Sequence, residues 1–230
     1  MNSKFRRLTK DLQRTILQAL LSLCTLLFLS PASADEVELL LDRLAACNDY
    51  QASFKQHLYA ADGELLQQGE GQVVIQRPRN LRWDIVRPLQ QTLIVRGDRY
   101  YQYDRDLEQL IDQPLSDRNA GLLRLLLAGD SGEVRRHYRV LRLEVDEGAI
   151  VEGTAKDTAA MRFRVFTRRD NSLFVSATLT FLQQQLQSIV VVDDFDQNSH
   201  FEFYDIAVNA LLDAAHFEID VPAGTDILRY

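Results

Sequence analysis

The chain has 230 residues, of which 46% are hydrophobic and 26% are charged, without the compositional biases of collagen-like, disordered or disulfide-rich proteins. This length fits one large domain or two small ones. The formal net charge is −7, and so acidic a chain has no overall electrostatic attraction to nucleic acid or to an anionic membrane surface, which argues against both partners.

The N-terminal segment is typical of a cleavable secretory signal peptide. Residues 1–16 carry five basic side chains and one acidic one, an apolar run occupies residues 16–29, and a small-x-small cleavage site follows at residues 31–34. The apolar run is too short to span a bilayer comfortably, which argues against a retained anchor. We therefore predict that residues 1–34 are removed. Residues 35–230 then form a single exported domain of 196 residues, in which 21 basic and 32 acidic residues give a net charge of −11.

The exported part begins with one amphipathic helix and continues mainly as strands. Residues 36–47 place apolar side chains at helical spacing after an acidic first turn. From Tyr50 the apolar period changes to two, which is typical of strands, and turn-forming groups separate the following segments. We predict strands at residues 50–58, 72–76, 81–86, 91–95, 99–104, 108–111, 138–145, 161–167, 174–181, 188–192 and 201–206.

A leucine-rich stretch interrupts the strands. Residues 119–129 contain five leucines and have the length of a short helix, and we interpret Gly129-Asp130-Ser131-Gly132 as its C-terminal turn. Two helices with about ten to eleven strands indicate a mainly β protein whose antiparallel sheet curls or closes. The interior of such a sheet need not be filled by side chains, and a helix can cover its mouth. A concave apolar interior beneath helices would be a lipid-sized binding site.

One motif resembles a known family. Its residues are Gly69-x-Gly71-x-Val73-x-Ile75-x-Arg77-Pro78-x-x-Leu81-x-Trp83-Asp84, followed by Pro88, Leu93-Ile94-Val95-x-Gly97-Asp98 and Tyr101-x-Tyr103-Asp104. This order and spacing resembles the LolA family, the periplasmic carriers of outer-membrane lipoproteins. Further matches, among them Asp213-Ala214-Ala215-x-Phe217, extend the resemblance over essentially the whole chain after residue 34.

The resemblance implies an incomplete, strongly curved antiparallel β-barrel whose open side is covered by a helical lid over an apolar cavity. It implies that acyl chains of a triacylated lipoprotein enter this cavity, and that Arg77 bonds to the lid helices and steadies the closed form. Leu81 stands where well-studied members have Phe. Ordinary core packing is the alternative for every apolar residue here, since sequence does not separate it from a cavity lining. The predicted lipid-binding and lid-control residues are Arg77, Leu81, Trp83, Ile85, Val73, Ile75, Leu122, Leu125 and Leu126.

The function implied by the resemblance is that of a non-enzymatic, monomeric chaperone in the periplasm of a Gram-negative bacterium. It would take acylated lipoproteins from an inner-membrane ABC exporter and deliver them to an outer-membrane acceptor. One alternative is a related carrier of another acylated or lipidic cargo. Another is a periplasmic sensor that binds lipoprotein on the same half-barrel. Such sensors carry an additional domain, for which 196 residues leave no room.

We interpret the remaining motifs as neither catalytic sites nor metal sites. Gly129-Asp130-Ser131-Gly132 superficially resembles the nucleophile segment of trypsin-like proteases, but none of the four histidines stands in a supporting motif, and we predict no catalytic residues. The segment Asp194-x-Asp196-x-Asn198 has the spacing of a calcium loop, but Ser199 replaces the required glycine, so we predict a polar hairpin turn. Without histidine pairs at metal-ligand spacing, we expect no metal and no cofactor. Cys47, the one cysteine after the leader, is expected to be a small packed side chain.

Overall fold

The computed structural model describes residues 35–144, 160–168 and 174–230, and residues 35–230 form one compact unit. The predicted signal peptide, residues 1–34, lies outside the described residues. No helix in the described ranges is long and apolar enough to cross a membrane.

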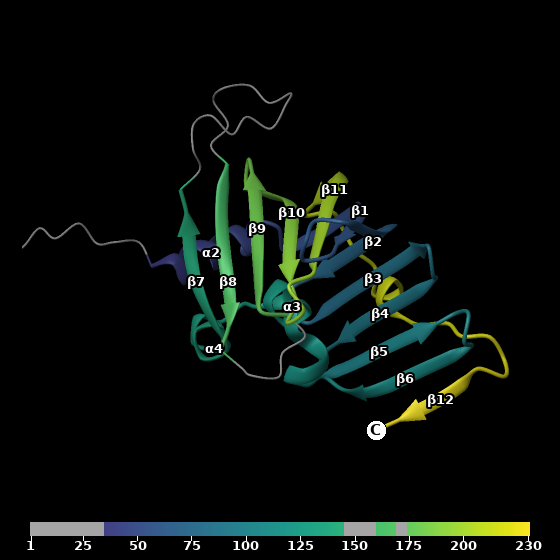
Figure 1. Ribbon diagram of the computed structural model, residues 1–230. Coiled ribbons are helices and arrows are strands. Elements are labelled where there is room, and N and C mark those ends of the chain that lie inside the picture. Colours follow the sequence, from purple (N-terminus) through teal and green to yellow (C-terminus); the bar gives the residue numbers. More distant parts are fainter. Residues whose placement is uncertain (1–34, 145–159, 169–173) are drawn as a thin grey trace, which may run out of the picture. The chain divides into compact units, whose positions relative to one another are not determined.

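Twelve strands of the described chain form a single sheet (Figure 1). They are β1 (Asp49–Tyr59), β2 (Leu65–Gln76), β3 (Asn80–Arg87), β4 (Gln91–Arg96), β5 (Arg99–Asp104), β6 (Gln109–Pro114), β7 (Tyr138–Leu143), β8 (Met161–Thr167), β9 (Ser176–Leu182), β10 (Gln185–Val192), β11 (Asn198–Val208) and β12 (Asp226–Arg229). Their spatial order is β12-β6-β5-β4-β3-β2-β1-β11-β10-β9-β8-β7. All neighbours pair antiparallel except β12, which runs parallel to β6.

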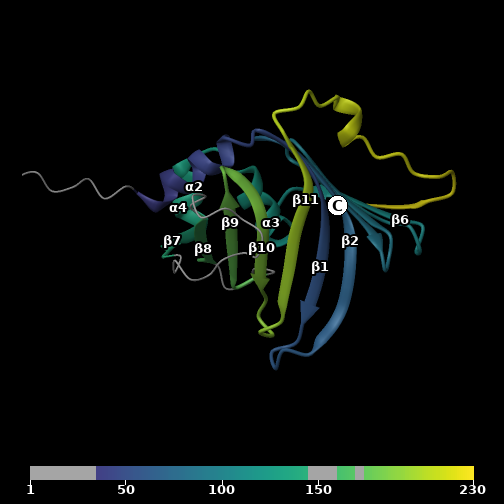
Figure 2. The same cartoon turned by 90° about the horizontal axis from the view of Figure 1, so that it is seen from above.

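The sheet is strongly curved but open, as expected for an incomplete barrel. Figures 1 and 2 show β7–β9 forming one wall and β3–β6 the other, with the long strands β1, β2 and β11 between them. The strand that the sequence did not predict is β12. Its four residues are too few to show an alternating pattern, and its pairing with β6 joins residues more than a hundred positions apart.

Three α-helices and one short 3-10 helix accompany the sheet in the described residues. They are α2 (Glu36–Ala45), α3 (Asp117–Leu127), α4 (Ser131–His137) and η1 (Ala214–Phe217). The sequence predicted α2 and α3 but not α4, and the interpretation of Gly129-Asp130-Ser131-Gly132 as a mere C-terminal turn was wrong. Asp130 is the N-cap of α4 because its side chain accepts a hydrogen bond from the Glu133 amide at 2.7 Å. We call α2, α3 and α4 the lid helices.

The interior is one apolar cluster between the lid helices and the concave face of the sheet. The helices contribute Val37, Leu40, Leu44, Leu125, Leu126 and Val134, among others, and every strand from β1 to β3 and β7 to β11 contributes inward side chains. On the opposite face, η1 packs against β3 and β4 and buries Phe217. The Arg82 Nη1 atom fixes this segment by donating to the Glu218 carbonyl at 3.0 Å.

Gly71 is required by the close approach of β2 to its neighbours. A Cβ atom at this position would lie 1.9 Å from the Asp84 carbonyl oxygen and 2.6 Å from Cζ of Phe54. The register between β2 and β3 also shifts between Glu70 and Gly71. The absence of a side chain therefore lets the Phe54 ring lie over β2 at an irregular, bent part of the sheet.

We predict that Gly71→Ala lowers the free energy of unfolding by about 2–3 kcal/mol, because the backbone oxygen of Asp84 cannot move aside as a flexible side chain would. Urea denaturation followed by circular dichroism measures the change. The matched control is Gly129→Ala, whose added Cβ would lie 3.6 Å from Pro78 in ordinary contact. Equal stability of the two variants would contradict this account of Gly71.

Candidate functional site

Arg77 joins the sheet to two lid helices. It follows β2 in the turn to β3, and its side chain is only 8% exposed. Its Nε atom donates to the Leu126 carbonyl in α3 at 2.8 Å, and its Nη1 atom donates to the carbonyl of Cys47, just after α2. Its backbone amide donates to the Asn48 carbonyl at 3.0 Å. One side chain thus holds the ends of α2 and α3 against the β2–β3 turn.

The Arg77 cation is buried without a paired carboxylate in the described structure. Both hydrogen bonds of its guanidinium go to main-chain carbonyl oxygens. Desolvation lowers the pKa of the Arg77 guanidinium to about 10, against the opposing influence of the acidic groups of Cys47, Tyr50 and Asp49. The side chain stays protonated at neutral pH. Asp49 Oδ1 is itself buried without a hydrogen-bond partner in the described residues. Such a cation depends on its two carbonyl contacts, because a buried charge without partners is strongly unfavourable.

The predicted apolar residues of β2 and β3 lie together on the concave face of the sheet. Val73 pairs with Trp83, and Ile75 pairs with Leu81, and all four side chains are at most 5% exposed. Ile85 is only partly buried and packs at the edge of the apolar cluster. It also lines a mainly polar pocket of about 380 Å³, together with Arg82 and Asp84.

The predicted leucines of α3 face this same cluster. Leu125 and Leu126 are fully buried, and Leu122 packs against the cluster from a partly exposed position. The structure therefore brings all the predicted site residues to one interior, with Arg77 at its border. Burial this complete is also what ordinary core packing gives, so the arrangement alone does not assign a ligand.

An aromatic cluster around Trp83 was not among the predicted site residues. The ring centroid of Trp83 lies 4.8 Å from that of Phe54, 5.2 Å from that of Phe201 and 6.1 Å from that of Phe203. Phe54 comes from β1 and the other two from β11, and Phe54 pairs directly with Phe203. The period-two pattern of residues 50–58 and 201–206 was the available signal, because it already placed these rings on the inward face.

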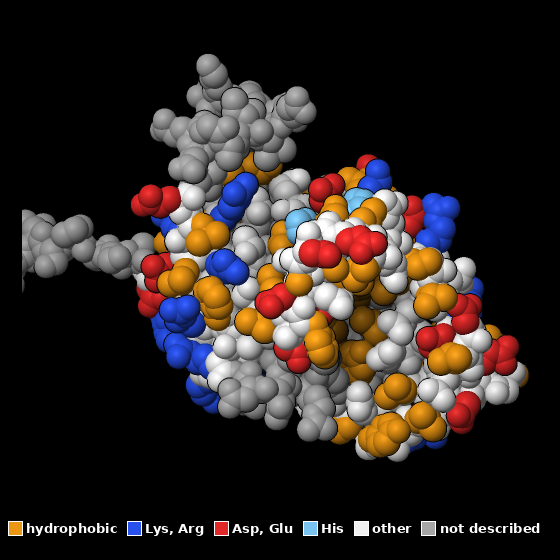
Figure 3. Space-filling model, viewed as in Figure 1, with side chains coloured by type: hydrophobic (Ala, Val, Ile, Leu, Met, Phe, Trp, Pro, Cys, Tyr) orange, Lys and Arg blue, Asp and Glu red, His pale blue; other side chains and the backbone are white. Residues whose placement is uncertain are grey.

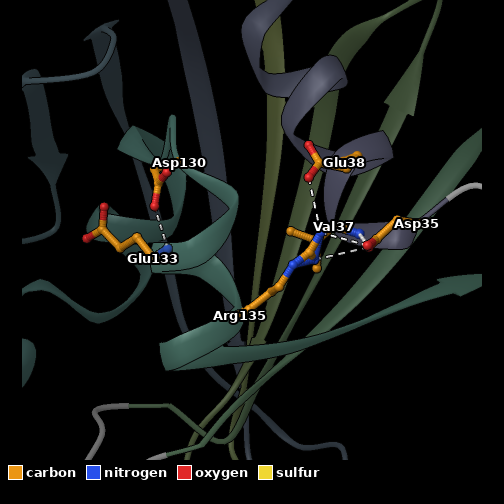
Figure 4. Close-up of polar contacts among 6 residues, drawn as sticks. All are labelled: Asp35, Val37, Glu38, Asp130, Glu133 and Arg135. Carbon is orange, nitrogen blue, oxygen red and sulfur yellow. Dashed lines mark hydrogen bonds and ion pairs between the residues drawn. The ribbon is translucent and has the colours of Figure 1, made fainter.

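Ion pairs connect the lid helices to one another, and Figure 4 shows those between α2 and α4. Arg135 of α4 forms ion pairs with Asp35 at 2.6 Å and with Glu38 of α2 at 3.1 Å, and Asp35 is also the N-cap of α2. Arg124 of α3 pairs with Glu133 of α4 at 2.9 Å. These contacts are partly exposed, and each contributes little to stability. They join α4 to both α2 and α3.

The face of the molecule seen in Figure 1 is hollowed near its centre, and hydrophobic side chains line the hollow in Figure 3. The described residues contain no group of three or more histidine, cysteine, aspartate or glutamate side chains that could hold a metal ion. The segment from Asp193 to Gln197, which overlaps the calcium-loop spacing, is the predicted hairpin turn. Its Asp193 Oδ1 atom accepts hydrogen bonds from the amides of Phe195 and Gln197, each at 2.9 Å.

Comparisons with known proteins agree on one family. The family model described as "Outer membrane lipoprotein carrier protein LolA" matches residues 45–220. An outer-membrane lipoprotein carrier protein of Chromohalobacter salexigens is 31% identical over 192 residues, which cover 82% of this chain and 86% of that protein. Another from Pseudomonas paraeruginosa is 30% identical over 219 residues, covering 94% and 98%. Among solved structures, an uncharacterized conserved protein of Thermus thermophilus has a TM-score of 0.50 at 14% identity and covers 85% of this chain and 100% of its own, a likeness that shows the fold alone.

Trp83 is the single tryptophan of the chain, so its fluorescence reports on the aromatic cluster. We predict that Phe54→Ala lowers the free energy of unfolding by about 3–5 kcal/mol and shifts the Trp83 emission to the red, because a fully buried ring against the indole is lost. The control is Phe195→Ala, which removes a ring that is 74% exposed. A red shift of similar size in both variants would show that Trp83 does not report on this cluster.

Proposed function

The chain belongs to the LolA family, and from that premise we propose that it is a periplasmic carrier that takes the acyl chains of outer-membrane lipoproteins into the interior beneath its lid helices. The observation that carries the proposal is the buried Arg77, whose guanidinium donates hydrogen bonds to main-chain carbonyls at the ends of α2 and α3. These bonds exist only when the helices lie over the sheet. They therefore stabilise the closed, empty form relative to an open form that admits an acyl chain.

The magnitudes fit a carrier that must both hold its cargo and release it. Burying one methylene contributes roughly 0.8 kcal/mol, so an acyl chain of about fifteen methylenes is stabilised by on the order of 12 kcal/mol. Two hydrogen bonds from a charged donor contribute together about 3–6 kcal/mol. Arg77 alone does not offset one acyl chain, and the apolar contacts of buried Leu125 and Leu126 supply about 1.5–3 kcal/mol each in addition. Closure is then of comparable size to the burial of one acyl chain, and contacts with a partner can shift the balance.

The proposed route runs from an inner-membrane ABC exporter, through the periplasm, to an outer-membrane acceptor. The support for this route is the name that the relatives carry, outer-membrane lipoprotein carrier protein. We further propose that the chain acts as a monomer without a cofactor and catalyses no reaction. Binding and release of cargo then depend only on the equilibrium between the closed and the open lid.

The first test uses spheroplasts of a Gram-negative cell that contain newly labelled lipoproteins. The protein, purified from the periplasm of an expressing host, is added, and the supernatant is assayed for acylated protein in a one-to-one complex. We expect release of lipoprotein in proportion to the added protein. A folded protein that releases none would contradict lipoprotein carriage, and mass spectrometry of lipids extracted from it would then identify another acylated cargo.

The second test separates the role of Arg77 from that of a neighbouring charge. We expect Arg77→Leu to accept lipoprotein from spheroplasts but to pass at least tenfold less of it to an outer-membrane acceptor, because the closed form loses both carbonyl contacts. Arg79→Leu is the matched control, since Arg79 lies in the same turn and is exposed. Normal transfer by Arg77→Leu, with its fold verified by circular dichroism, would refute the proposed role.

A further inference from the structure

A basic surface lies on one wall of this acidic protein. Figure 3 shows blue side chains, interspersed with hydrophobic ones, over the region of β7, β8 and α4. We call this region the basic wall. Its arginines, apart from the paired Arg135, are Arg136, Arg139, Arg142, Arg162, Arg164 and Arg168.

The strand register places part of this wall on the convex face of the sheet. On β8, Phe163 and Val165 are buried in the apolar cluster, so Arg162, Arg164 and Phe166 point to the opposite side. Arg139 of β7 pairs with Phe166. The Phe166 ring centroid lies 4.6 Å from Cζ of Arg139 and 5.2 Å from Cζ of Arg164. Leu141, also exposed, pairs with Arg164. The surface is therefore a mixture of cations and apolar side chains.

These arginines lack carboxylate partners in the described part of the chain. None of the six forms an ion pair there, whereas Arg135 nearby pairs with both Asp35 and Glu38. Arg136, Arg164 and Arg168 donate hydrogen bonds to uncharged acceptors there, which leave their positive charge without a counter-charge. Residues 145–159, between β7 and β8 in the sequence, lie outside the described residues and carry four carboxylates, so a test must use the whole exported chain.

Protection of a sheet edge explains only part of the pattern. Charged side chains on an edge strand discourage pairing with another chain, and β7 is an edge of the described sheet. This reason covers Arg139 and Arg142. It does not cover Arg162 and Arg164, because β8 is paired on both sides, with β7 and with β9.

We propose that the basic wall binds the anionic phospholipid headgroups of a membrane surface. Arginines would contact the phosphates, and Leu141 and Phe166 would contact the adjoining apolar region, as amphipathic side chains do at a membrane interface. The overall negative charge does not prevent such contact, because charges more than a Debye length of about 8 Å away are largely screened at physiological ionic strength. This proposal differs from the sequence-based argument against an anionic membrane, which considered only the net charge of the chain. This inference goes beyond the carrier function and does not depend on it.

The test measures flotation of the exported protein with vesicles of phosphatidylcholine and phosphatidylglycerol in a 7:3 mixture, set against phosphatidylcholine alone. We expect binding only to the anionic vesicles, and its loss on raising the salt several-fold. The triple variant Arg139→Gln/Arg162→Gln/Arg164→Gln should bind at least tenfold more weakly. The control Arg79→Gln/Arg96→Gln/Arg105→Gln removes the same charge from exposed arginines elsewhere and should bind within twofold of the unaltered protein.

Three outcomes would overturn the proposal: no binding to anionic vesicles, equal binding to neutral vesicles, or equal losses in the two triple variants. If the first triple variant released less lipoprotein from spheroplasts although the unaltered protein bound no vesicles, the basic wall would serve an acidic protein instead. Because the vesicles contain no lipoprotein, failure of this test leaves the carrier proposal intact. Failure of lipoprotein release likewise leaves the vesicle result standing.

Discussion

A charge buried in an apolar interior must find hydrogen-bond partners, and this requirement at Arg77 links the sheet to the helices that cover it. The guanidinium donates to the carbonyl of Cys47, just after α2, and to that of Leu126, near the end of α3. These are its only hydrogen-bond acceptors among the described residues. Separation of the helices from the sheet would leave the cation to be solvated by water entering the interior. The closed arrangement is therefore specified by one polar group as well as by the fit of apolar surfaces.

The other features of the fold support this arrangement. Gly71 lets an aromatic ring lie across the bent part of β2, and the rings of Phe54, Phe201 and Phe203 surround Trp83 beneath the helices. Exposed ion pairs join the lid helices to one another, while Arg77 joins them to the sheet. Further hydrogen bonds join the helices to the sheet: Asn209 Nδ2 donates to the Ala46 carbonyl at 3.1 Å, and Tyr138 Oη donates to the Gly121 carbonyl at 2.9 Å.

The sequence was sufficient for much of the fold, because alternation and turn residues are local signals. Eleven of the twelve strands were predicted, as were α2 and α3. It was insufficient where structure depends on distant pairing or on a cap. The segment β12 has too few residues for a period, and α4 is a helix of seven residues whose start depends on Asp130 serving as a cap. At the site, the family motif predicted Arg77 and the apolar residues of β2 and β3. For Phe54 and Phe203 the sequence offered only the alternation of apolar and polar residues along their strands. The acceptors of Arg77 are backbone atoms, which no side-chain pattern identifies.

Acceptors that are backbone atoms do not depend on the side chains of the residues that carry them. Every residue presents a carbonyl oxygen, so substitution of Leu126 or Cys47 by another residue compatible with the local backbone leaves the acceptor in place. The two hydrogen bonds from Arg77 are therefore independent of which side chains the helices carry at these positions. If the protein carries acyl groups as we propose, these side chains could differ in size and shape without loss of the two Arg77 contacts. Under that proposal, substitutions that alter cargo preference and substitutions that alter lid opening would affect different atoms of the protein.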